Sequence, residues 1–327
     1  MIDFEAYLCK RKKTVEAALG RGLRGNLGAP PVLAEAMRHA VMNGGKRLRP
    51  ALLLAAASAY GLPEKKALPA ACAFELVHCF SLVHDDLPAL DNDALRRGKP
   101  TVHTLYGEAA ALLAGDALLI SAFELLAKTA VAPARALRAS ALLAQAAGAA
   151  GMTGGQTADL FAEGLPKESR RLKQLKKSGA KGAGKPTAFY LLPDGKAEPE
   201  RVLRYIHLHK TAAMLAAPLE AGAALAGAPE RELAQLRAFG LDCGLAFQIS
   251  DDILDVAGDK KRLGKRGSDR DNAKLTYVSL YGLEQSRKMV YSLLARAKKR
   301  LASLKHADKN RLEPLYGLAD FLAERNY

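Results

Sequence analysis

The amino-acid sequence predicts an all-α protein. Apolar segments at 51–59, 109–128, 136–150 and 211–226 are rich in strong helix formers and show none of the alternation expected of strands. No βαβ pattern is present, so a parallel sheet is not expected. With 327 residues, 49% of them hydrophobic, the chain can build one large core, or two domains at most.

The composition restricts the class of partner. A formal charge of +15, from 49 basic and 34 acidic residues, would ordinarily suggest nucleic acid or an anionic membrane. Nearly half of this excess lies in 167–185, which has eight Lys or Arg and one Glu but no interleaved aromatic platform. Nucleic acid is therefore not an expected partner.

Cysteine usage and the amino terminus indicate a cytoplasmic protein. The four cysteines have no zinc-like spacing and are interpreted as reduced core thiols. The first residues do not resemble a secretory signal, and the most apolar segments are interrupted by polar residues or are short. No segment is expected to cross a bilayer.

The string Gly-Gly-Lys-Arg-Leu-Arg-Pro at 44–50 is the first candidate site. Its paired glycines end one helix, and Pro50 suits the first turn of the next. Lys46 and Arg49 would then lie at a helix amino terminus, where free N–H groups and the positive end of the dipole favour phosphate.

An acidic cluster follows at 85–91, in otherwise apolar sequence. Buried carboxylates are costly without a counter-charge, so the cluster indicates a hard divalent cation, magnesium first. Six residues separate Asp85 from Asp91, which would place them about 240° apart on an ideal helix. Both can converge only if the helix ends first, and Pro88 supplies that break.

Three basic groups follow along the chain. Arg96 and Arg97 come directly after the acidic cluster and could reach anionic oxygens. Lys210 and Thr211 share one face of a predicted helix with His207. Lys265 and Lys274 lie near a glycine-containing loop, which an ordinary solvated loop would explain equally well.

The second acidic cluster, at 251–255, is predicted to lie on a helix. Asp251 and Asp255 are one turn apart and Asp252 lies nearby, so one helix face can carry all three carboxylates. Carboxylates for a metal, interleaved with cations for phosphate, are what an enzyme that handles diphosphates through magnesium requires.

At this point the chain resembles the trans-isoprenyl diphosphate synthases, most closely the short-chain bacterial farnesyl diphosphate synthases. The strings that carry the resemblance lie in order at 44–50, 75–93, 95–101, 154–156, 209–211 and 247–255. The resemblance implies the isoprenoid synthase type I fold, a single helical bundle around a central cavity over 1–327, in which the two acidic motifs face each other. It also implies a homodimer.

The resemblance further implies roles for individual residues. Three magnesium ions would be held, directly or through water, by Asp85, Asp86, Asp91, Asp251, Asp252 and Asp255. The allylic diphosphate would contact Arg96, Lys210, Gln248, Lys265 and Lys274. Isopentenyl diphosphate would contact Lys46, Arg49, His78 and Arg97. Catalytic roles would fall to Lys210, Thr211 and Gln248, and the oxygens of the last two would stabilise a carbocation.

Product length depends on the residues just before the first acidic motif. Phe80 and Ser81 precede Asp85 by five and four residues, and in similar bacterial enzymes an aromatic there accompanies short products. Farnesyl diphosphate is the expected product, with geranylgeranyl or geranyl diphosphate as the alternative. A terpene cyclase would lack the isopentenyl site, and the family's non-catalytic subunits would lack an intact acidic pair.

The chain departs from its relatives at about 165–200, where a basic, glycine-containing insertion of roughly thirty residues intervenes. A mobile surface loop would explain it. The alternative is that the insertion docks weakly to an anionic membrane or an acidic partner. A non-catalytic protein that binds anionic surfaces would have the same feature, and it is the competing function from a different class.

Overall fold

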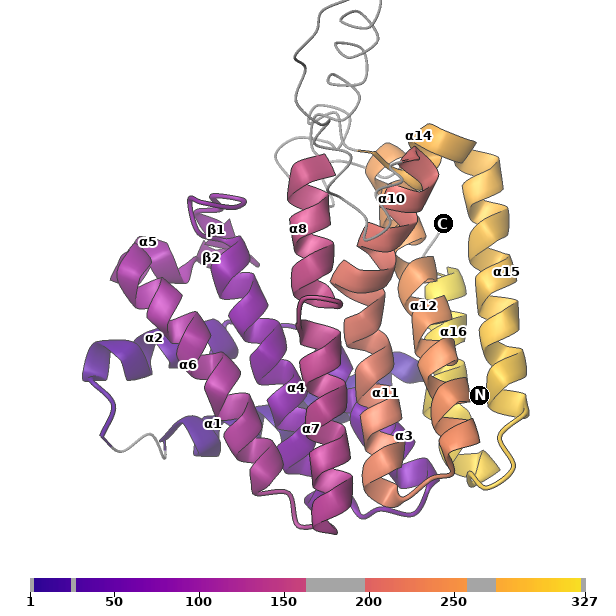
Figure 1. The fold of residues 1–327 in the computed structure, drawn as a ribbon, viewed down its shortest axis with the longest axis horizontal. Coiled ribbons are helices and arrows are strands. Elements are labelled where there is room, and N and C mark those ends of the chain that lie inside the picture. The colour runs from indigo at the N-terminus through magenta and orange to yellow at the C-terminus, as the bar shows by residue number, and fades with distance from the viewer. Residues whose placement is uncertain (1–2, 25–27, 163–197, 258–274, 325–327) are drawn as a thin grey trace, which may run out of the picture. The chain divides into compact units, whose positions relative to one another are not determined.

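The structure is a computed structural model that describes residues 3–24, 28–162, 198–257 and 275–324. Over these ranges the chain is almost entirely helical (Figure 1), which confirms the all-α prediction. Its described strands are β1 (Leu95–Arg96) and β2 (Lys99–Pro100), which pair antiparallel with Arg96 opposite Lys99.

Helices make up most of the described chain. The amino-terminal ones are α1 (Phe4–Arg24), α2 (Pro31–Met42), α3 (Leu48–Ala59), α4 (Glu64–Asp85), α5 (Val102–Tyr106), α6 (Glu108–Ala127), α7 (Pro133–Ala147) and α8 (Met152–Ala162). The later ones are α10 (Pro199–Ile206), the π-helix η2 (His207–Ala212), α11 (Ala213–Ala226), α12 (Glu230–Ala257), α14 (Tyr277–Tyr281), α15 (Leu283–Ala302), the 3₁₀-helix η3 (Lys309–Leu312) and α16 (Glu313–Glu324).

The chain divides into two compact units. The first comprises Met1–Ala144, Ala217–Arg237 and Ser303–Leu318, and the second comprises Gln145–Ala216, Ala238–Ala302 and Ala319–Tyr327. The expectation of one domain over 1–327 stays a prediction.

The core of the first unit is built around α3 and α4. Helix α4 packs against α3 and α6, and also against α1 and α2. Nine of the 12 residues of α3 are buried, because a helix that is apolar on every side is stable only when neighbours surround it. Leu53 is 0% exposed, and its replacement by Ala should cost about 2–5 kcal/mol. This core fixes the positions of the candidate residues that α3 and α4 carry.

In the second unit, α8, α10 and η2 pack together. Ala158 and Ala162 of α8 form a small apolar cluster with Val202 and Ile206 of α10. The chain continues from α10 directly into η2, a rare helix type that is often found at functional sites. The predicted helix around His207 is therefore present, with a local change of hydrogen-bond pattern.

Two described helices, α4 and α6, are long and apolar enough to cross a membrane by length and composition alone. The apolar stretch of α4 is 61% buried inside the protein and that of α6 is 33% buried. Core helices of globular proteins pass the same test. The expectation that no segment crosses a bilayer stays a prediction, and the exposed face of α6 needs an explanation of its own.

Candidate diphosphate-binding site

The first acidic motif lies where α4 ends. The helix stops at Asp85, three residues before Pro88, and the chain turns so that the backbone N–H of Asp91 donates to the carbonyl of Asp85 over 2.9 Å. This confirms the predicted break. The turn brings together the backbone of two residues that a continuous helix would have placed far apart around its axis.

Asp86 differs from its neighbours in its surroundings. It is 4% exposed, whereas Asp85 is half-buried and Asp91 is exposed. Burial raises the pKa of Asp86, although Arg96 opposes this by donating from Nε to Oδ1 over 2.6 Å. Arg96 also lies 3.6 Å from Asp93. Asp86 therefore orients Arg96, a role distinct from that of the more accessible Asp85 and Asp91.

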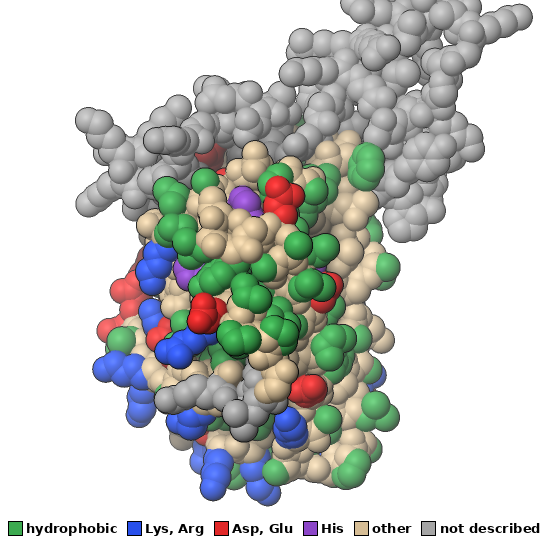
Figure 2. All heavy atoms as spheres, turned by 90° about the vertical axis from the view of Figure 1, so that its left-hand side faces the viewer, with side chains coloured by type: hydrophobic (Ala, Val, Ile, Leu, Met, Phe, Trp, Pro, Cys, Tyr) green, Lys and Arg blue, Asp and Glu red, His purple; other side chains and the backbone are tan. Residues whose placement is uncertain are grey.

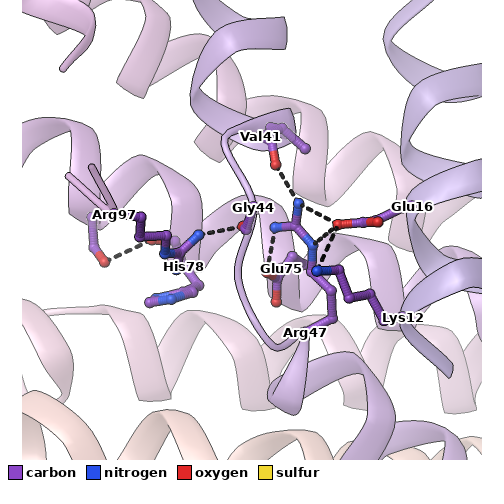
Figure 3. Close-up of polar contacts among 9 residues, drawn as sticks. Lys12, Glu16, Val41, Gly44, Arg47, Glu75, His78 and Arg97 are labelled. Atoms are coloured by element: carbon purple, nitrogen blue, oxygen red, sulfur yellow. Dashed lines mark hydrogen bonds and ion pairs between the residues drawn. The ribbon is translucent and has the colours of Figure 1, made fainter. Parts of the chain in front are cut away.

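Arg97 joins the hairpin to the glycine string of 44–50. Its Nη1 donates to the carbonyl of Gly44 (Figure 3). Its guanidinium also lies against Gly45, where an added Cβ would approach Nη1 to 2.5 Å. Gly45 also has a φ of +117°, a backbone conformation that other residues rarely adopt. Gly45 therefore has to be a glycine, because any side chain there would displace the guanidinium of Arg97.

Arg49 and His78 complete this part of the site. Burial lowers the pKa of Arg49, while the nearby carboxylate of Glu75 opposes the change. Burial and the positive charges of Arg49 and Arg97 hold the pKa of His78 well below its usual range. The site thus combines two guanidinium groups with a neutral imidazole that can donate one hydrogen bond.

An unsatisfied donor in this cluster suits an anion. Arg49 Nε is buried and has no hydrogen-bond partner among the described residues. Buried donors without a partner are rare, because leaving one unsatisfied costs about 1–3 kcal/mol. A diphosphate oxygen is a suitable acceptor, because arginine forms strong, often bidentate bonds with phosphate groups. Lys46, which is exposed, lies three residues before Arg49, on the loop that leads into α3.

In the second unit, the glycine string of 154–156 allows close packing of α8 on η2. A Cβ on Gly155 would overlap the backbone nitrogen of Lys210. Lys210 Nζ forms an ion pair with Asp159 of α8. The predicted diphosphate ligand Lys210 is therefore held by a carboxylate that sequence reasoning did not single out.

The two residues expected to stabilise a cation do lie together. Thr211 Oγ1 donates to Oε1 of Gln248 on α12 over 2.9 Å. The hydroxyl oxygen keeps its acceptor capacity when its proton is used in this way.

The second acidic motif lies within α12, as predicted. Asp251 and Asp255 are half-buried, whereas Asp252 is 8% exposed and accepts a hydrogen bond of 2.8 Å from the backbone N–H of Tyr277. The carboxylate of Asp252 thus anchors the start of α14. Lys265 and Lys274 lie outside the described residues.

Across the described residues, no three Asp, Glu, His or Cys side chains form a ready-made metal site. The chemistry of the donors nevertheless suits magnesium, which binds through one or two carboxylates and takes further oxygens from substrate phosphates and water. Asp85 and Asp91, linked by their backbone bond, and the half-buried Asp251 and Asp255 are carboxylates of the kind that would hold such an ion.

Comparison with known proteins decides the family. A family model described as Polyprenyl synthetase matches residues 30–310. The chain belongs to the polyprenyl synthetase family. It is 41% identical over 325 residues to geranylgeranyl pyrophosphate synthase 7, chloroplastic, of Arabidopsis thaliana, and the match covers 99% of this chain and 84% of that protein. It is 43% identical over 324 residues to a dimethylallyltranstransferase of Fischerella ambigua, covering 98% and 83% of the two chains.

Solved structures give the same result for the fold of this polyprenyl synthetase. An FPP/GFPP synthase from Zymomonas mobilis superposes with a TM-score of 0.74 at 32% identity, covering 98% of this chain and 99% of the other. A geranyltransferase from Legionella pneumophila gives 0.76 at 29% identity, covering 98% and 97%. The protein therefore has the isoprenoid synthase fold and is a trans-prenyltransferase. Enzymes of this family generally use Mg²⁺.

Two residues of this polyprenyl synthetase were missed by sequence reasoning. Asp159 pairs with Lys210, and a possible signal was its place on the helix that begins with the 154–156 string. Arg47 lies inside the 44–50 string but received no role, because its burial depends on residues of three other helices.

Proposed function

We propose that the protein condenses isopentenyl diphosphate head-to-tail with allylic diphosphates such as dimethylallyl and geranyl diphosphate. The observation that carries this proposal is the cluster of Arg49, His78 and Arg97, with its unsatisfied Arg49 Nε, in the same unit as Asp85 and Asp91. A second diphosphate site of this kind favours a condensing enzyme over a terpene cyclase, which needs only one.

In the proposed reaction, Lys46, Arg49 and Arg97 hold the diphosphate of isopentenyl diphosphate, with His78 as a neutral donor. Arg96, Lys210, Gln248, Lys265 and Lys274 contact the allylic diphosphate. Asp86 keeps Arg96 oriented for this contact.

The chemistry proceeds by ionisation, condensation and proton loss. The allylic carbon–oxygen bond breaks with both electrons going to the diphosphate, whose charge Lys210 and Arg96 stabilise. The double bond of isopentenyl diphosphate then forms the new carbon–carbon bond, and the departed pyrophosphate takes the proton that is lost. Oxygens of Thr211 and Gln248 stabilise the cation before attack.

Magnesium is part of the proposal: Asp85, Asp91 and Asp251 would hold three ions directly, and Asp86, Asp252 and Asp255 would support them directly or through water. When bound, it supplies positive charge to the leaving diphosphate. The Asp252–Tyr277 contact supports a structural contribution from Asp252 in addition.

The product is proposed to be farnesyl diphosphate. Phe80 supports this, because its ring is half-buried beside the first acidic motif and packs edge-on against His84 at 5.4 Å between centroids. Geranylgeranyl diphosphate is the second candidate, since several relatives are named geranylgeranyl pyrophosphate synthases. Mass analysis of the products of wild type and Phe80→Ala separates the two. If the wild type stops at fifteen carbons and Phe80→Ala makes longer chains, Phe80 limits length; an unchanged distribution would contradict this.

We further propose that the protein forms a homodimer through α5 and α6. Figure 2 shows hydrophobic side chains gathered on this face, and the exposed ones include Leu105, Leu112, Leu113 and Ile120, of which Ile120 is 61% exposed. Apolar groups gathered in this way usually mark a protein interface. One relative is named the large subunit of a heterodimeric synthase, so a different partner subunit is the alternative.

Light scattering on purified protein tests this assembly. The wild type should have twice the mass of one chain, and Leu113→Glu with Ile120→Glu should give monomers. Tyr291→Glu, at an exposed apolar residue of α15, is the matched control and should leave the mass unchanged. A monomeric wild type, or a dimer unaffected by the double substitution, would contradict the proposal.

A cytoplasmic location is proposed as well. The cysteines are unpaired, and Cys72, Cys79 and Cys243 are buried, as expected of thiols in a reducing compartment. The suggested docking to an anionic membrane concerns the basic insertion at about 165–200, of which 165–197 lies outside the described residues. Deletion of 167–196 followed by binding to anionic vesicles tests it, and unchanged binding would remove the idea.

A further inference from the structure

Arg47 is a charged residue in an unusual environment. It is 2% exposed, the most buried of the basic residues in the 44–50 string, and its φ of +53° is in the left-handed region. A residue other than glycine is uncommon there and persists only where the surroundings hold it in place. The side-chain contacts of Arg47 supply that hold.

Three helices contact its guanidinium (Figure 3). Nη1 donates to Glu75 on α4 over 2.8 Å, Nε donates to Glu16 on α1 over 3.2 Å, and Nη2 donates to the carbonyl of Val41 on α2 over 2.6 Å. Glu16 is in turn 4.0 Å from Lys12, one helical turn earlier. Arg47 therefore ties the start of α3 to three elements of the first unit.

The neighbours of Arg47 in sequence are the residues proposed to bind isopentenyl diphosphate. Lys46 precedes it and is exposed, and Arg49 follows two residues later in the first turn of α3. The carbonyl of Gly44, at the other end of the loop, accepts from Arg97. A buried anchor in the middle of this loop fixes the directions in which the flanking cations point.

Arg47 also neutralises a carboxylate close to the anion site. Glu75 has 2% of its side chain exposed and acts electrostatically on Arg49 as well as on Arg47. Without Arg47, this buried negative charge would stand uncompensated near a bound diphosphate and would weaken its binding.

We infer that Arg47 is a positioning residue for the isopentenyl diphosphate site: it holds the 44–49 segment in place for Lys46 and Arg49, and it screens Glu75 from the substrate. This inference rests on the proposed function. It assigns Arg47 no contact with either substrate.

Steady-state kinetics on the full-length protein tests the inference with Arg47→Met, Arg47→Lys and the control Arg296→Met. Arg296 also forms an ion pair with a buried carboxylate, that of Asp242 over 2.6 Å, but its own side chain is exposed and it lies in the second unit. Arg47→Met should raise the KM for isopentenyl diphosphate tenfold or more and change the KM for geranyl diphosphate less than twofold. Arg47→Lys should fall between Arg47→Met and wild type, because it keeps the charge but loses the fork of donors.

The double variant Arg47→Met with Glu75→Gln separates the two parts of the role. It should have a lower KM for isopentenyl diphosphate than Arg47→Met alone, because the uncompensated charge is removed. An equal or higher KM would overturn the screening of Glu75. Equal increases in both KM values for Arg47→Met, or the same changes in Arg296→Met, would overturn the positioning role.

Titration calorimetry with inorganic pyrophosphate keeps this test independent of turnover. Arg47→Met should bind pyrophosphate at least fivefold more weakly than Arg296→Met, with circular dichroism confirming that both are folded. If Arg47→Met does not fold, Arg47→Lys takes its place. A wild type without prenyl transfer would defeat the proposed function, whereas equal pyrophosphate binding by the two variants would defeat the role of Arg47.

Discussion

Replacing Gly45 by Ala should weaken isopentenyl diphosphate binding by displacing Arg97. The added Cβ would lie 2.5 Å from Nη1 and 2.8 Å from Cζ of Arg97, so the guanidinium must move by about 1 Å to reach the ordinary contact distance of 3.4 Å. A hydrogen bond to a charged group contributes about 1.5–3 kcal/mol. If the shift costs Arg97 one such bond to the diphosphate, affinity falls about 10- to 140-fold.

Gly44→Ala is the matched control for this change. Gly44 also has a positive φ, +97°, so both substitutions impose backbone strain of about 1–3 kcal/mol, but a Cβ on Gly44 would meet nothing within 4 Å. The difference between the two variants therefore isolates the displacement of Arg97. The assay is the KM for isopentenyl diphosphate at saturating geranyl diphosphate, with thermal unfolding as the measure of strain. If both variants had the same KM, the proposed contact between Arg97 and substrate would be refuted.

Three further predictions concern other parts of the chain. Gly115→Ala should lengthen or broaden the range of products measured by mass spectrometry. The added Cβ would overlap the ring of His84, which packs against Phe80. An unchanged product distribution would argue against a role of His84 in holding Phe80 in place. Burial raises the pKa of Glu232, but hydrogen bonds to its carboxylate outweigh this and lower the pKa from 4.5 to about 2. The ionised carboxylate therefore stabilises the fold by about 3 kcal/mol above pH 4.5, and this stabilisation is lost as the pH falls from 4.5 towards 2. The difference in unfolding free energy between wild type and Glu232→Gln should shrink over that range, and a difference independent of pH would contradict the assignment. Asp252→Asn should increase hydrogen exchange at the amide of Tyr277, because a neutral acceptor replaces a charged one; unchanged exchange would remove the anchoring role.

Local sequence chemistry was enough to predict the helical fold and the end of the helix at the first acidic motif. Long Ala- and Leu-rich segments without strand alternation indicated the all-α fold, because such segments have few stable alternatives to a buried helix. The break after Asp85 followed from the spacing of the first acidic motif, and the helical second motif followed from its own spacing. These features depend on residues a few positions apart.

Features that depend on distant residues could not be predicted in this way. The contact between Gly45 and Arg97 joins residues more than fifty positions apart, and the burial of Arg47 needs partners on α1, α2 and α4. Asp251 and Asp252 are the same residue type in adjacent positions, yet Asp252 is buried and accepts from the backbone of α14, whereas Asp251 is half-buried. Packing between helices, which a single sequence does not display, determines such differences.

Incubation of the purified protein with magnesium, isopentenyl diphosphate and each allylic diphosphate, with products identified by mass, tests the central claim most directly. The account predicts prenyl diphosphates extended by five-carbon units, no product when a chelator removes the metal, and a large loss of turnover in Asp85→Ala. Absence of any prenyl product from every starter, or undiminished turnover of Asp85→Ala in the presence of chelator, would contradict it.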